Sequence, residues 1–159
     1  MPGRRIFIPL AAPALLSVVL ALPARACPPS LTIERPSNSS SGDGRDAFVL
    51  VHAVQGCHPG QLTVSGTAEG LVGQERRIIQ LEVAPTATPG LYRVPQQWPH
   101  EGVWVLRLVV TVGDGHATAL VGINASGEVT TVRQPTREGR AIREFSDADV
   151  EALLCRLAA

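Results

Sequence analysis

The stretch Val103–Val112, with the sequence VWVLRLVVTV, decides the fold of this chain. Every second residue from Trp104 onward is large and apolar, which is the period of a β-strand with one face in a core. The triplet Gly-Asp-Gly at 113–115 then predicts a tight reversal into a second apolar run, Ala117–Ile123. We therefore predict a β-hairpin here, with Trp104 buried at the head of its apolar face.

Short apolar or alternating runs continue on both sides of this hairpin, and turn signals separate them at intervals of roughly 8–12 residues. This spacing is typical of a sandwich or barrel. The predicted fold is an all-β, immunoglobulin-like antiparallel β-sandwich of about seven strands with a short C-terminal α-helix. The predicted strands cover residues 47–54, 61–69, 76–83, 91–94, 103–112, 117–123 and 128–133.

The segment 134–159 is predicted to be a polar connector followed by the helix. Ser146 and Asp149 have the spacing of a capping box, in which each side chain satisfies a backbone N–H at the helix start. The residues that follow place apolar side chains at i, i+3, i+4 and i+7, so one stripe of the helix should dock on the sandwich. That stripe consists of Val150, Leu153, Leu154 and Leu157.

The N-terminus has the pattern of an export signal at residues 1–26. Arg4 and Arg5 precede the apolar run 6–22, and Ala-Arg-Ala at 24–26 fits a cleavage site. No further apolar segment of about 18 residues follows. Residues 27–159 are therefore expected to be periplasmic or secreted, without a transmembrane segment, as a flexible arm (27–46), one β-sandwich domain (47–133) and the C-terminal segment.

Charge argues against two classes of partner. The whole chain carries 14 basic and 14 acidic side chains. Removal of Arg4, Arg5 and Arg25 with the signal leaves an excess of three acidic groups. A basic surface is the usual footprint of binding to nucleic acid or to anionic membranes, so neither partner is expected.

The three cysteines are Cys27, Cys57 and Cys155, and an export compartment favours their oxidation. Spacing alone does not rank the three possible pairings. Because Cys57 and Cys155 lie in or beside predicted ordered elements, we predict a disulfide between them, with Cys27 free at the new N-terminus. A lipid anchor at Cys27 is the less favoured alternative, because Arg25 interrupts the small residues that such a signal needs.

One short stretch raises the question of a metal site. His52, Cys57 and His58 lie within seven residues, and imidazole with thiolate suits copper or zinc. The spacing contains no C-x-x-C or H-x-x-x-H pair, and no methionine follows Met1. Alternation along a strand would also separate these side chains. We predict no metal and no cofactor, and keep a copper or zinc carrier that uses these three residues as the alternative.

Catalytic patterns are absent from the sequence. It contains no G-x-S-x-G elbow, no H-E-x-x-H pair, and no Walker or dinucleotide-binding glycine motif. The acid pair Asp147 and Asp149 is explained by helix capping. The sequence therefore predicts a protein that is not an enzyme.

Residues 90–106, GLYRVPQQWPHEGVWVL, carry a Gly-x-Tyr pattern followed by Pro-x-x-Gly-x-Trp-x-Leu. This segment resembles small exported bacterial immunoglobulin-like modules of the YtkA-like and FixH-like kind. The resemblance implies that Tyr92 and Trp104 are core anchors, that Gly102 is a turn residue and that Pro99 ends a strand. Some such proteins are found near copper handling or cytochrome oxidase assembly.

Taken with the export signal, these patterns predict a non-catalytic binding or accessory module of the periplasm or cell envelope. Its partner is expected to be a protein or a small ligand of unknown identity.

Overall fold

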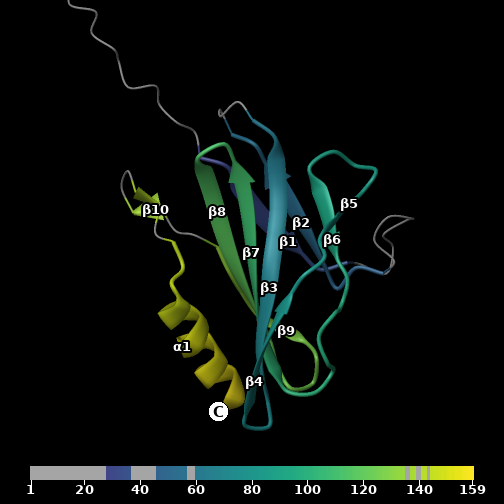
Figure 1. Cartoon of the computed structure of the whole chain (residues 1–159), viewed down its shortest axis with the longest axis vertical. Coiled ribbons are helices and arrows are strands. Elements are labelled where there is room, and N and C mark those ends of the chain that lie inside the picture. The colour runs from purple at the N-terminus through teal and green to yellow at the C-terminus, as the bar shows by residue number, and fades with distance from the viewer. Residues whose placement is uncertain (1–27, 37–45, 57–59, 135–136, 139–140, 143) are drawn as a thin grey trace, which may run out of the picture.

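The computed structural model of the chain describes residues 28–36, 46–56, 60–134, 137–138, 141–142 and 144–159. These residues form two antiparallel sheets and one helix (Figure 1). The four-stranded sheet has the order β1-β2-β6-β5, made of Ser30–Glu34, Val49–Val54, Leu91–Val94 and Ala84–Pro85. The five-stranded sheet has the order β4-β3-β7-β8-β9, made of Glu75–Gln80, Leu62–Val72, Val103–Val112, Gly115–Ile123 and Val129–Arg133.

The predicted all-β sandwich with a short C-terminal helix is confirmed, and the hairpin of β7 and β8 forms with Val112 paired to Gly115. The strand count is higher than predicted, with nine strands in the two sheets of the described chain. The prediction of a flexible arm over 27–46 is wrong in part, because strand β1 lies inside this segment. Its residues Leu31 and Ile33 alternate with polar residues, and the strand pairs with β2. The predicted connector contains a two-stranded sheet, β10 (Arg137–Glu138) with β11 (Ala141–Ile142).

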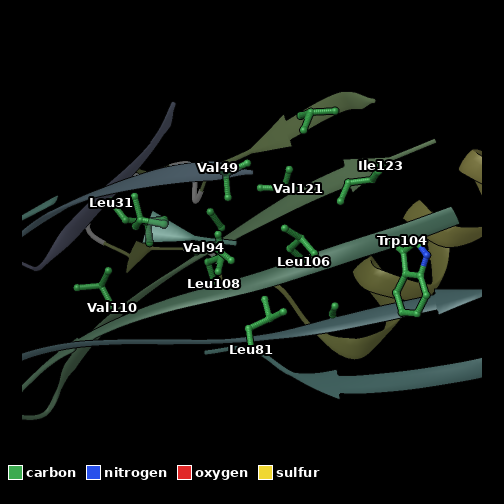
Figure 2. Close-up of a cluster of buried hydrophobic side chains, with 14 of the residues drawn as sticks. Leu31, Val49, Leu81, Val94, Trp104, Leu106, Leu108, Val110, Val121 and Ile123 are labelled. Atoms are coloured by element: carbon green, nitrogen blue, oxygen red, sulfur yellow. The ribbon is translucent and has the colours of Figure 1, made fainter. Parts of the chain in front are cut away.

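The core lies between the facing sides of the two sheets. Figure 2 shows side chains from both sheets pointing toward one another along the length of the sandwich, with Trp104 at one end. Trp104 is 1% exposed, as predicted. Tyr92 is only partly buried at the margin of this core. Trp98 is also buried and meets Phe48 edge to face, with 5.0 Å between the ring centroids.

The Trp104 ring packs directly against the backbone of Gly70, which has no side chain in the way. The two residues are paired across β3 and β7, and a Cβ added at Gly70 would lie 2.3 Å from the indole ring. The indole Nε1 donates a hydrogen bond to the Glu101 carbonyl oxygen at 2.9 Å. Gly70 and Gly73 lie close together in the sequence but have different roles. Only Gly73, with φ of 64°, lies in the turn, because Gly70 continues β3 beneath the indole.

Helix α1 (Asp147–Ala158) covers part of the outer face of the five-stranded sheet. Ser146 and Asp149 form the predicted capping box. The apolar stripe of the helix packs on side chains that β7 and β8 turn away from the sandwich core, as predicted. The buried residues of this second cluster are Val103, Val105, Leu120, Val150, Leu153 and Leu154. Among the helices that the structure describes, none is long and apolar enough to cross a membrane.

Candidate functional site

The outer face of the four-stranded sheet differs from that of its partner. The β1–β2 register places Ser30 opposite Val54 and Thr32 opposite His52, with Glu34 beside them on the same side. All five of these side chains are exposed, and Val54 keeps 59% of its surface accessible. We call the set Ser30, Thr32, Glu34, His52 and Val54 the β1–β2 face.

A hydrogen-bonded pair of side chains crosses this face. The His52 Nε2 and Glu34 Oε2 atoms are 2.8 Å apart, with about half of each side chain exposed to solvent. Because a carboxylate only accepts hydrogen bonds, the Nε2 atom carries the proton in this contact. An exposed pair of this kind stabilises a fold by about 1 kcal/mol at most. The His52–Glu34 pair places a hydrogen-bond donor and an acceptor next to the exposed Val54.

The two outer faces are used differently within the described chain. Helix α1 covers Val103, Val105 and Leu120 of the five-stranded sheet. On the four-stranded sheet, no described helix covers Val54 or His52, although Leu50 at the other end of β2 is buried. The β1–β2 face is therefore an exposed strip of small polar groups, one valine and one hydrogen-bonded His–Glu pair on a flat sheet.

Of the three residues of the alternative copper or zinc site, the structure describes only His52. His52 is on the β1–β2 face, whereas Cys57 and His58 lie outside the described residues. His116, on β8 of the other sheet, pairs with Glu144 ahead of α1, and His100 is hydrogen-bonded to Gln96 in the β6–β7 loop. No group of three histidine, cysteine or acidic side chains with metal-binding proximity occurs in the described ranges.

Cys155 is free and exposed on helix α1, and the other two cysteines lie outside the described residues. Because Cys57 is not among the described residues, the Cys57–Cys155 bridge stays a prediction.

An ion-pair cluster that the sequence analysis did not identify joins β3, β4 and α1. The Arg76 guanidinium donates to Glu69 at 2.9 Å and to Glu151 on the helix. These hydrogen bonds, first that with Glu69, raise the pKa of Arg76 above its ordinary value. Arg77 is held in turn by Glu75 at 2.7 Å. The charges of Arg76 and Arg77 are thus matched by carboxylates of the same chain.

Comparison with known proteins returned no match to any family model, curated protein or solved structure. The resemblance of residues 90–106 to YtkA-like and FixH-like modules therefore stays a prediction.

Proposed function

We propose that the protein is an exported, non-catalytic binding module of the periplasm or cell envelope, and that it contacts a protein partner through the β1–β2 face. The observation that carries the proposal is the difference between the two outer faces. One is packed by α1, whereas the other presents Val54, 59% exposed, beside the His52–Glu34 pair.

The shape of this face favours a protein over a small ligand. Small-molecule sites are concave and surround most of their ligand, whereas a sheet face is flat and suits the surface of another protein. The composition agrees with that view, since an exposed apolar side chain with hydrogen-bonding groups around it is the usual anatomy of a protein interface. The export part of the proposal rests on residues 1–26, whose charged start, apolar run and small-residue end fit a cleaved signal.

The proposal is tested by photo-crosslinking in the producing cell. The full-length chain is expressed with a photoreactive residue in place of Val54, and Thr63, exposed on the outer side of β3, is replaced in the same way as the matched control. We expect the chain recovered from the envelope fraction to lack residues 1–26 and to form one adduct of fixed mass from position 54 only. The substitution Glu34→Arg should reduce that adduct at least several-fold. Equal adducts from both positions, or retention in the cytoplasm, would contradict the proposal.

A second measurement addresses the metal-carrier alternative. Titration calorimetry of the purified protein with copper(II) and with zinc is expected to show no stoichiometric binding tighter than about micromolar. The physical reason is that Glu34 already engages the Nε2 atom of His52, and that a strand directs neighbouring side chains to opposite faces.

The control for this titration is His116→Ala, which removes a histidine on the other sheet. Tight binding that is lost in both His52→Ala and His58→Ala, and is kept in His116→Ala, would replace the binding-module proposal with the metal-carrier one.

A further inference from the structure

Among the described strands, β4 is the one long edge strand without a protective feature in its own sequence or pairing. Sheet edges carry unpaired backbone groups, and proteins usually guard them with proline, bulges or short strands. Strand β5 has two residues and ends in Pro85, and β1 follows Pro28 and Pro29. Strand β9 has an irregular register with β8 between Gly122 and Ile123. Strand β4 has six residues without such a device.

The side chains of β4 also do little to prevent another strand from pairing with this edge. Ile78 in its centre is 65% exposed. Charged side chains commonly keep an edge soluble, but here Arg76 is tied back to Glu69 and Glu151, and Arg77 to Glu75. The exposed isoleucine is therefore flanked by charges that already have partners within the same chain.

One hydrogen bond shows which backbone groups of β4 face outward. The Leu81 N–H donates to the Gly66 carbonyl at 2.9 Å, which continues the ladder beyond the Thr67–Gln80 pair. Hydrogen-bonded and non-hydrogen-bonded pairs alternate along an antiparallel ladder. The residues of β4 that face away from β3 with both N–H and C=O are therefore Arg76, Ile78 and Gln80.

This pattern is self-complementary. In an antiparallel pairing of two β4 strands centred on Ile78, Ile78 lies opposite Ile78 of a second copy, and Arg76 lies opposite Gln80. All three outward-facing residues then fall in hydrogen-bonded pairs, which supplies about six backbone hydrogen bonds. Arg77 lies opposite Ile79, so no two like charges are directly opposed.

We propose that two copies of this chain associate through β4, edge to edge, with a two-fold axis at Ile78. The two five-stranded sheets then form one continuous sheet that carries both α1 helices on the same side. A second copy fits this edge because the pairing satisfies the outward-facing backbone groups of both strands. It also covers Ile78 of both copies. The inference is independent of the proposed β1–β2 face, which belongs to the other sheet.

The test uses the full-length gene product, purified after expression, in sedimentation experiments over a wide concentration range. We expect a monomer–dimer equilibrium that Ile78→Lys weakens at least tenfold, because two lysines would meet at the axis. The matched control is Val132→Lys, which places the same charge on an exposed valine of the opposite edge strand β9. Circular dichroism establishes that both variants are folded.

A second readout locates the interface. A nitroxide label at position 78, in a chain whose cysteines are replaced by serine, should give one short label-to-label distance, whereas a label at position 132 should give a longer one. A wild-type protein that stays monomeric up to about 1 mM, or a dimer equally strong in Ile78→Lys and Val132→Lys, overturns the proposal.

Discussion

Replacing Trp104 by alanine is expected to lower the free energy of unfolding by about 3–5 kcal/mol. The indole lies at one end of the core (Figure 2) and is 1% exposed. Its Nε1 donates a hydrogen bond to the Glu101 carbonyl. Its removal leaves a cavity bounded by two strands that pair along their length. The neighbouring glycine offers no side chain to fill that space, so the cavity should collapse only in part.

The measurement is chemical denaturation followed by circular dichroism, with the midpoint and slope fitted separately. Val54→Ala serves as the control, since this exposed valine should change stability by about 0.5 kcal/mol or less. If Trp104→Ala unfolded at the same denaturant concentration as the wild type, the assigned place of the indole would be wrong.

The second large effect is expected at Gly70, and its sign should depend on residue 104. Gly70→Ala places a Cβ within 2.3 Å of the indole ring, so we expect a loss of about 1–3 kcal/mol from overpacking. With Trp104→Leu in place, the same change should be neutral or stabilising. Gly70 has an ordinary negative φ, and alanine is better than glycine inside a strand by roughly 0.5–1 kcal/mol.

A double-mutant cycle measures this coupling. The control is Gly73→Ala, because Gly73 has a φ of 64° and an added Cβ would meet nothing within 4 Å, so its cost arises from the backbone. That cost should be the same with tryptophan or leucine at 104. Strictly additive effects of Gly70→Ala and Trp104→Leu would show that the two residues do not share one packing site.

The parts of the fold that could be predicted are those whose signal is local. Strand β7 alternates over ten residues, and the helix carries its own capping box and apolar stripe. Strand β1 has only Leu31 and Ile33 as apolar residues, and it becomes a strand through its pairing with β2. A two-residue strand such as β5 (Ala84–Pro85) has no recognisable pattern of its own.

The candidate site was harder to predict, because its contacts join distant residues. His52 could be placed on a strand, but its partner Glu34 is 18 residues away and is brought near by the register of β1 on β2. The Arg76–Glu151 contact spans 75 residues and depends on where the helix docks. Sequence shows the charges, whereas only the packed structure shows which of them are matched.

Strand β7 buries side chains on both of its faces. Trp104 belongs to the sandwich core, and its neighbour Val105 belongs to the cluster under the helix. The two hydrophobic clusters therefore lie on opposite faces of the same strand, with no further layer of protein between them. We therefore expect a disturbance of one cluster to affect the other, and the helix to unfold together with the sandwich as one cooperative unit.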